Sequence, residues 1–578
     1  MSGVFVPQDG QEGVRVLSLA ETAQGLDLGA LEGVGLALSA LSKDPGVKGT
    51  VLHLRGAAPL GPAMADVIGE LAWAIESCPK PVVACLEGVI GGAIWALALA
   101  AHYRFAASDV QIILPEARFG LMPAAGTTQR LPRLIGAAQT IRMMLGAQAE
   151  TAEDLLALGA LDRVGEGAGQ DAAAEALRLG MAPRRTRDEV AGLRDAKRYL
   201  TEVRAFQDRV TDDPLDVSRA VVKCVEGALL LPFARGLALE AVSLQDLGQA
   251  PQTRAVRHAA ASERAARAAL RAMAQQVSAA PTPPVRRIGI WRPGAAQAEV
   301  VLAALSRGIT VVVVDPDRLA MTAFLGQVAA LQEARVAQNE MTTETRDADW
   351  SRLQTAAEEA LEGCDVILAA AAGARQGMVP LLALGGWGQG LRLWPGGVFG
   401  GHAELALGEG QVGVAEAMDL ARQLGWRLQI TGRGGFIAPH LAQARQAAVA
   451  RLAELGHAPA DIAAGLGLVG LGPGATARQK PKGAAVDDLG HLAMAALANE
   501  AMRRLDEGAA GTEQEVDAAA LACGLLARWA GGPLYQADQR GLILLRADLM
   551  RLGGAGRLVP CALLNRMIEQ GTRLYPQA

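Results

Sequence analysis

Two features within residues 80–136 could do chemistry: a glycine-rich turn and a lone carboxylate. The apolar run Pro81 to Leu86 has the length of a strand, and Gly88 to Gly92 predict a turn after it. The apolar stretch Ala93 to Ala101 then predicts a buried helix. The first backbone N–H groups of a helix lack partners and carry partial positive charge, so this turn could stabilise a developing oxyanion.

The lone carboxylate is Glu116, which follows Pro115 in a predicted loop between apolar runs. A carboxylate held next to an oxyanion site could remove or deliver a proton. Glycine turns before helices are common, however, and Glu116 could equally be a surface carboxylate paired with Arg118 or Arg130. The residues alone leave both interpretations open.

The elements that must position these groups alternate between strand and helix. Val14 to Leu19 and Lys48 to Leu54 predict strands, whereas Leu28 to Leu41 and Ala63 to Ile75 predict amphipathic helices. Such alternation predicts an α/β layer fold for residues 1–185.

Residues 186–283 have a charged, helical pattern without strand signals and predict a helical linker. The prolines in residues 281–284 predict a domain boundary, because proline fixes an extended backbone and ends helices.

A second α/β region is predicted for residues 284–432. Strand Arg287 to Trp291, helix Ala295 to Ser306 and strand Thr310 to Val314, followed by Asp315, have a dinucleotide-binding order. Cys364 to Ala369 predict a later strand of the same sheet.

Residues 433–578 predict an all-helical domain. Within it, Ala485 to Leu505 and Val516 to Ala530 have amphipathic patterns.

Composition narrows the classes of function. The chain has 578 residues, enough for about two to four domains, and a net charge of -5 without a basic tract, so we expect neither nucleic-acid nor membrane-surface binding. No signal-peptide pattern and no apolar run of spanning length is found, and the six scattered cysteines predict reduced, buried thiols in a cytoplasmic protein. The isolated histidines give no metal-binding spacing.

The sequence of residues 80–136 resembles that of the crotonase (enoyl-CoA hydratase/isomerase) family, and the resemblance extends over residues 1–185. The matching pieces are Lys80-Pro81-Val82, Gly88-Val89, Gly92, His102-Tyr103-Arg104, Leu114-Pro115-Glu116, Gly120-Leu121-Met122-Pro123 and Thr128-Gln129-Arg130-Leu131-Pro132-Arg133-Leu134-Ile135-Gly136.

The rest of the chain resembles the multifunctional fatty-acid β-oxidation proteins, in which a hydratase is fused to a 3-hydroxyacyl-CoA dehydrogenase. The pieces include Leu231-Pro232-Phe233-Ala234-Arg235-Gly236, Arg257-His258-Ala259, and Trp529 with Gly531-Gly532-Pro533. The resemblance implies a crotonase spiral, a helical linker, a Rossmann-like domain and a C-terminal all-α domain.

In the family's hydratases two glutamates flank the substrate. The resemblance places the second at Glu116 and the first at Ala96, which cannot transfer protons, and it places bulky Trp95 where the family has a small or aliphatic residue. The family's oxyanion hole maps onto the backbone N–H groups of Ala63 and Ala93. The family's enoyl-CoA isomerases work with a single carboxylate at the position of Glu116.

The dehydrogenase half departs further from its family. Of the family's GxGxxG motif only Gly294 remains, and Asp315 could hold a ribose hydroxyl or simply end a strand. The catalytic histidine position is Arg392, with His402 nearby but offset, and the family's NTSTL strand is missing altogether. We therefore expect no dehydrogenase activity and little or no NAD binding.

These expectations leave two main functions. The first is an acyl-CoA enzyme, an isomerase or residual hydratase that needs no cofactor besides its CoA thioester substrate. The second is a catalytically dead acyl-CoA-binding or regulatory subunit, and a lyase acting on a CoA thioester is a third possibility. The resemblance also allows a homo-oligomer or a thiolase-type partner.

Overall fold

The computed structural model describes residues 7–9, 13–21, 26–57, 59–165, 170–211, 213–277, 283–294, 297–369, 381–384, 392–396, 401–407, 413–472 and 484–575. The chain forms two compact units, mainly residues 1–257 and mainly residues 258–578. Within the described part, every helix is too short or too polar to cross a bilayer.

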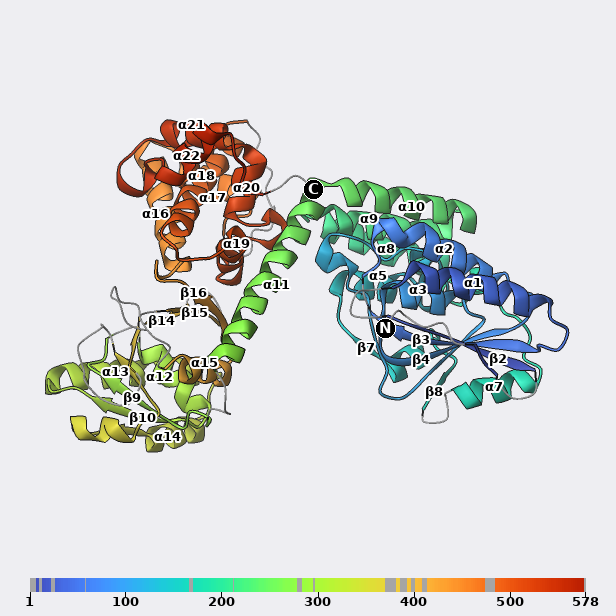
Figure 1. Cartoon of the computed structure of the whole chain (residues 1–578), viewed down its shortest axis with the longest axis horizontal. Coiled ribbons are helices and arrows are strands. Elements are labelled where there is room, and N and C mark those ends of the chain that lie inside the picture. Colours follow the sequence, from blue (N-terminus) through green and yellow to red (C-terminus); the bar gives the residue numbers. More distant parts are fainter. Residues whose placement is uncertain are drawn as a thin grey trace. The chain divides into compact units, whose positions relative to one another are not determined.

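Unit 1 contains an eight-stranded sheet in which β1-β2-β3-β4-β5-β8 are neighbours, while β6 pairs with β4 and with β7 (Figure 1). The β1–β2 and β6–β7 pairs are antiparallel and the other pairs are parallel. The strands are β1 Pro7–Asp9, β2 Val14–Ala20, β3 Gly49–Gly56, β4 Val82–Gly91, β5 Tyr103–Ala106, β6 Gln111–Ile113, β7 Glu150–Thr151 and β8 Arg163–Val164.

The helices of this α/β layer follow the strands, as the alternation of patterns predicts. They are α1 Leu28–Lys43, α2 Pro62–Glu76, α3 Gly92–Ala100, α4 Thr127–Ile135, α5 Ala137–Gly146, α6 Ala152–Leu158 and α7 Gln170–Arg178. Helix α3 is buried on every side, which explains why its sequence is apolar without amphipathic spacing.

The predicted glycine turn Gly88 to Gly92 is wrong in extent. Strand β4 continues to Gly91, and Val89 to Gly91 pair with β6 after the earlier residues of β4 have paired with β5. Gly88 has φ +73°, which lets the strand change direction without ending. The helix therefore follows the strand directly, at Gly92.

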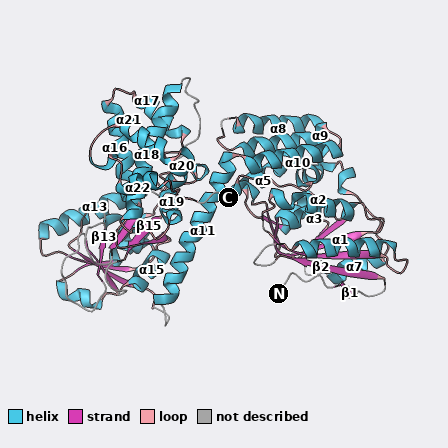
Figure 2. Cartoon of the chain, turned by 45° about the horizontal axis from the view of Figure 1, so that its top comes forward, coloured by secondary structure: helices cyan, strands magenta, loops and turns pink. Residues whose placement is uncertain are grey.

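The region predicted as a linker is helical, as expected, with α8 Ala196–Val210, α9 Asp216–Leu230, α10 Phe233–Gln249 and α11 Pro251–Val277. Side chains of α8, α9 and α10 join the same hydrophobic core as α2 to α5. Figure 2 shows these helices stacked next to α5. The predicted boundary at residue 185 stays a prediction, but α8 to α10 pack as part of unit 1.

Unit 2 begins its sheet with β9, and the strand order is β11-β10-β9-β12-β13-β14-β15-β16. All neighbours are parallel except β14 and β15, so the dinucleotide-binding order predicted from the first strands is present. The strands are β9 Arg287–Trp291, β10 Thr310–Val314, β11 Leu353–Thr355, β12 Val366–Ala369, β13 Leu381–Leu384, β14 Arg392–Gly396, β15 His402–Ala406 and β16 Arg427–Thr431.

Helices α12 Gln297–Ser306, α13 Arg318–Ala337, α14 Thr343–Arg352 and α15 Val414–Gln423 accompany this sheet. Residues 295 and 296 of the predicted first helix lie outside the described residues. Strand β13 lies between β12 and β14 and is parallel to both.

The remaining helices of unit 2 form the all-α part, as predicted: α16 Ala438–Glu454, α17 Pro459–Leu468, α18 Ala484–Asp506, α19 Glu513–Ala522, α20 Pro533–Arg540, α21 Leu542–Leu552 and α22 Ala562–Gln570. The prediction that one helix runs from Val516 to Ala530 is wrong. Helix α19 ends at Ala522, because Gly524 adopts φ +72°, a left-handed conformation that ends helices.

Candidate active site

Glu116 does not lie in an exposed loop. It is the first residue of a one-turn 3-10 helix, Glu116–Phe119, and its side chain is 0% exposed. Its Oε1 accepts a hydrogen bond from the backbone N–H of Leu60 at 3.2 Å. Its Oε2 is buried and has no hydrogen-bond partner among the described residues. The interpretation as a surface ion pair is therefore wrong, and Arg130 pairs with buried Glu76 instead, at 2.9 Å.

The surroundings of Glu116 favour a proton carrier. Burial raises the pKa of this carboxyl to about 7, against the lowering effect of its own backbone N–H and that of Leu60. A group with a pKa near neutrality is present in both protonation states, so it can take up a proton and return it.

The two backbone N–H groups expected to form an oxyanion hole lie in the first turns of two helices. Ala63 is in the first turn of α2 and is exposed, whereas Ala93 is in the first turn of α3 and is 4% exposed. N–H groups at these positions lack intrahelical acceptors. The start of α3 is fixed by Gly91, where an added Cβ would lie 2.2 Å from the carbonyl oxygen of Ile113.

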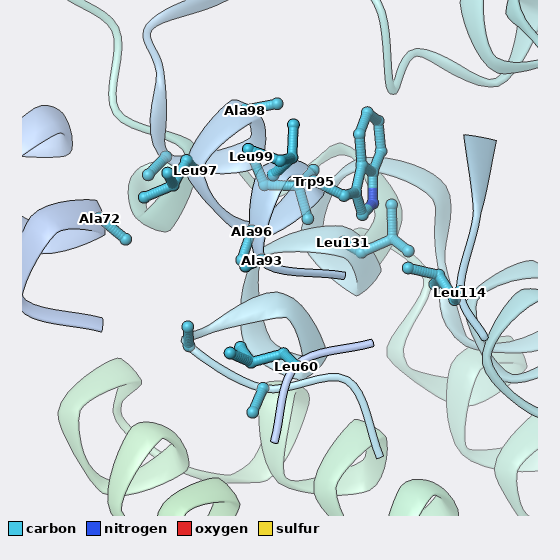
Figure 3. Close-up of a cluster of buried hydrophobic side chains, with 14 of the residues drawn as sticks. Leu60, Ala72, Ala93, Trp95, Ala96, Leu97, Ala98, Leu99, Leu114 and Leu131 are labelled. Carbon is cyan, nitrogen blue, oxygen red and sulfur yellow. The ribbon is translucent and has the colours of Figure 1, made fainter. Parts of the chain in front are cut away.

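The position to which the resemblance assigns the family's first glutamate carries only a methyl group. Ala96 is 1% exposed and, being three residues after Ala93, lies on the same face of α3 (Figure 3). Trp95 points to the side of Leu114 and Leu131 in Figure 3 and is fully buried. Its indole N–H has no acceptor among the described residues.

Sequence reasoning missed Glu240, a buried carboxylate on α10 that binds the backbone at the start of α4. It accepts hydrogen bonds from the N–H groups of Gly126 at 2.6 Å and Thr128 at 2.9 Å, and from the Thr128 hydroxyl. It therefore caps the start of α4, the helix that follows Glu116 in the chain. Its partners are more than a hundred residues away in sequence, so no local pattern could reveal them.

Two other family-matching residues are also structural. His102 Nδ1 accepts from the N–H of Val82 at 2.9 Å, and burial lowers its pKa to about 4. Arg104 is fully buried and donates to the carbonyl of Ala160 at 2.8 Å. These contacts bind α/β elements to one another rather than a ligand.

In the dinucleotide-type turn of unit 2, a side chain of the turn itself accepts a hydrogen bond from the backbone. The N–H of Gly294 donates to Oε1 of Gln297 at 2.6 Å, and Arg292 adopts the left-handed φ of +50°. Asp315 Oδ1 accepts from the N–H of Asp317 at 2.9 Å, so it closes its own turn.

Neither histidine cluster of unit 2 has the geometry of a hydrolase. Both Ser262 and Asp517 approach the same nitrogen of His258, Nε2, at 3.2 and 2.8 Å, whereas a catalytic triad uses both ring nitrogens. His402 Nδ1 lies 3.0 Å from the carbonyl oxygen of Arg427 and its ring is buried. Within the described part no group of acidic, histidine or cysteine side chains could hold a metal.

Comparison with known families finds a match for part of unit 1. Residues 65–179 match the family model described as enoyl-CoA hydratase/isomerase. This part of the chain is similar to the enoyl-CoA hydratase/isomerase family. The match includes Ala93, Ala96 and Glu116, so the crotonase resemblance read from the motifs is confirmed.

Curated relatives extend the match beyond the hydratase/isomerase domain. The chain is 27% identical over 312 residues to the peroxisomal bifunctional enzyme of Pongo abelii, covering 52% of this chain and 42% of the relative. The Homo sapiens enzyme of that name is 26% identical over 312 residues (52% and 42%), and that of Danio rerio 43% identical over 106 (18% and 15%). The chain thus spans less than half the length of these relatives.

Solved structures that match part of this chain include an enoyl-CoA hydratase from Mycobacterium avium subsp. paratuberculosis K-10. It is 19% identical with a TM-score of 0.31, covering 44% of this chain and 98% of the hydratase. The predicted fold class, α/β with a crotonase-type unit, parallel sheets and a helix-rich C-terminal part, is confirmed.

Proposed function

We propose that the hydratase/isomerase domain transfers a proton within an enoyl-CoA thioester and that Glu116 carries this proton. One observation carries the proposal: the carboxyl is buried, one oxygen is fixed by Leu60, and the other has no partner among the described residues. An oriented base with a free lone pair is what abstraction of a proton next to a carbonyl requires.

The proposed reaction is the isomerisation of a 3-enoyl thioester. Glu116 removes a proton from C2, and the electron pair left on C2 forms a C1–C2 double bond while the thioester oxygen gains negative charge, which gives a dienolate that keeps its C3–C4 double bond. The N–H groups of Ala63 and Ala93 stabilise this oxyanion. Glu116 then returns the proton to C4, so the double bond ends between C2 and C3 with no net gain or loss of atoms.

Isomerisation is favoured over hydration because hydration needs a second group to activate water. Ala96 occupies that position with a methyl, and the loss of one acid/base group typically lowers a rate by about 10²–10⁴. CoA thioesters are the substrate class of the enoyl-CoA hydratases that the chain resembles, and the proposed step needs no further cofactor.

A second candidate is a non-catalytic acyl-CoA-binding or regulatory subunit. Two observations favour it: Ala96 replaces one acid, and Gln297 occupies the backbone donor of the dinucleotide turn. In both candidates the dehydrogenase half is inactive and binds no NAD. A homo-oligomer or thiolase-type partner and a cytoplasmic location remain proposals, and the curated relatives are named peroxisomal.

The test is a turnover assay of the full chain with a cis-3-enoyl-CoA and a trans-2-enoyl-CoA. Glu116→Gln keeps an acceptor for Leu60 but removes the base, and Glu153→Gln changes an exposed glutamate on α6 as the matched control. We expect conversion of the 3-enoyl substrate by the wild type and the control, and a loss of at least about 10²-fold in Glu116→Gln.

Three results separate the candidates. Hydration that survives in Glu116→Gln would show that another residue is the acid/base group. Absence of turnover with either substrate, together with acyl-CoA binding in calorimetry, would favour the non-catalytic subunit. Absence of both turnover and binding would reject both candidates.

A further inference from the structure

Arg392 is a buried cation without an anionic partner among the described residues. It opens strand β14, its side chain is 5% exposed, and its guanidinium carbon lies 5.6 Å from the ring centroid of Phe436. Its Nε is buried without an acceptor, and the described residues supply neither a hydrogen bond nor an ion pair to the rest of the guanidinium.

A carboxylate on the strand next to Arg392 already binds backbone N–H groups. Glu404 lies on β15, next to β14, and its two oxygens accept from the N–H groups of Ile437 at 2.7 Å and Ala438 at 2.9 Å. It therefore caps helix α16. A second buried arginine of this unit, Arg504, forms ion pairs with Glu500 and Glu507, so Arg392 differs from it in being unpaired.

The register of the sheet places Arg392 at the edge where this fold binds ligands. Arg392 pairs with Ala383 of β13, which pairs with Ala369 of β12, which pairs with Trp291, the last residue of β9. Arg392 is thus level with the carboxyl end of β9. In open α/β sheets ligands bind in the crevice outside this edge.

The backbone beside the guanidinium is kept free of side chains. Gly435 has φ +92°, and a Cβ there would lie 3.4 Å from Nη1 and 3.6 Å from Nη2 of Arg392. The guanidinium carbon of Arg392 lies over the ring of Phe436, and its N–H donors have no acceptor among the described residues.

A buried guanidinium without a counter-charge is costly, because arginine stays ionised and loses its hydration. Burial also lowers the pKa of Arg392, so the fold weakens the charged form and offers no compensating anion. The planar fork of N–H donors matches the oxygens of a phosphate or carboxylate.

We propose that Arg392 is an anion-binding residue of the dehydrogenase-like half, and that it holds a phosphate or carboxylate group of a ligand at the carboxyl edge of the sheet. This site lies in unit 2 and stands whether or not the hydratase/isomerase domain turns over. A degenerate dehydrogenase half would then be a ligand-binding module in place of an oxidoreductase.

The test uses the full chain and two probes, inorganic phosphate and malonate, titrated by calorimetry and by thermal unfolding at constant ionic strength. Arg392→Met removes the charge with little change in volume, and Arg392→Lys keeps the charge without the fork. Arg427→Met is the matched control, because Arg427 is an exposed arginine of the same sheet, on strand β16 two strands from β14, and donates to the carbonyl of Ala522.

We expect saturable binding of at least one probe to the wild type and to Arg427→Met. Arg392→Met should lower the affinity by about 10- to 100-fold, with Arg392→Lys between them. Without a probe, Arg392→Met should unfold at a higher temperature than the wild type, because the unpaired charge is gone. Tighter phosphate binding would indicate a phosphorylated ligand, and tighter malonate binding a carboxylate.

Two results would overturn the proposal. One is the absence of saturable binding of either probe to the wild type. The other is equal binding by the wild type and both Arg392 variants. A fall in the unfolding temperature of Arg392→Met with unchanged binding would make the guanidinium a packing group on Phe436.

Discussion

The backbone N–H of Leu60 donates to Oε1 of Glu116 at 3.2 Å, across 56 residues of sequence. Leu60 ends the loop that enters α2, and Ala63 lies in the first turn of that helix. The segment that carries one proposed oxyanion donor thus also orients the carboxyl. A shift of this loop would move the base and the donor together, so the two groups of the proposed reaction share one support.

Stability should depend on pH through Glu116. Its folded pKa is about 7, above the unfolded value of 4.5, so the stabilisation is complete below pH 4.5 and is lost as pH rises through 7. The loss approaches about 3 kcal/mol. Glu116→Gln should remove this slope and be more stable than the wild type at pH 8. Denaturant unfolding between pH 5 and 8 measures both, and parallel curves for the two proteins would contradict the raised pKa.

The turnover of the wild type should rise with pH and level off above about 7, since the ionised form of Glu116 is the base. A rate independent of pH between 5.5 and 8.5 would assign the proton transfer to a different group.

A carboxyl group introduced at position 96 should shift the reaction from isomerisation toward hydration. Ala96→Glu adds a carboxyl on the face of α3 that carries Ala93, and it should raise hydration of trans-2-enoyl-CoA by up to about 10²–10⁴-fold. The site is 1% exposed, so the variant should also lose stability. Ala96→Gln has a similar size and no base. If it hydrates as well as Ala96→Glu, the effect is not acid/base catalysis.

Glu240 should be a major support of unit 1. Glu240→Ala leaves the buried N–H groups of Gly126 and Thr128 without an acceptor, and we expect a loss of about 2–4 kcal/mol. Asp246→Ala, an exposed change on the same helix, should cost less than about 0.5 kcal/mol. Calorimetric unfolding of the full chain compares them, and equal effects would mean that α10 does not hold α4.

NADH should not bind to unit 2. Titration with NADH should give no saturable energy transfer from tryptophan, although Trp291 ends the strand next to the turn. Gln297→Ala frees the N–H of Gly294 but should not restore binding, because Arg292 and Pro293 remain in the turn. Saturable transfer in the wild type would show that the turn rearranges around the dinucleotide.

The motifs that identify the family best are mostly parts of the scaffold. Arg130 pairs with Glu76, His102 accepts from Val82, and Thr128 donates to Glu240. In this chain these residues hold the elements of unit 1 together. Sequence comparison cannot assign them roles, since their partners come from distant segments.

The sequence by itself determined the alternation of strands and helices, the dinucleotide-type strand order and the residue types at the candidate site. The strands and helices follow from local hydrophobic periodicity. The residue types include Ala96 and Arg392, which stand where the resembled families have a glutamate and a histidine. Tertiary structure alone decided that Glu116 is buried, that Glu240 caps α4 and that Arg392 lacks a partner. Burial and pairing depend on contacts between residues far apart in the chain, and the pKa of a carboxyl or the cost of a guanidinium follows from those contacts rather than from its neighbours in sequence.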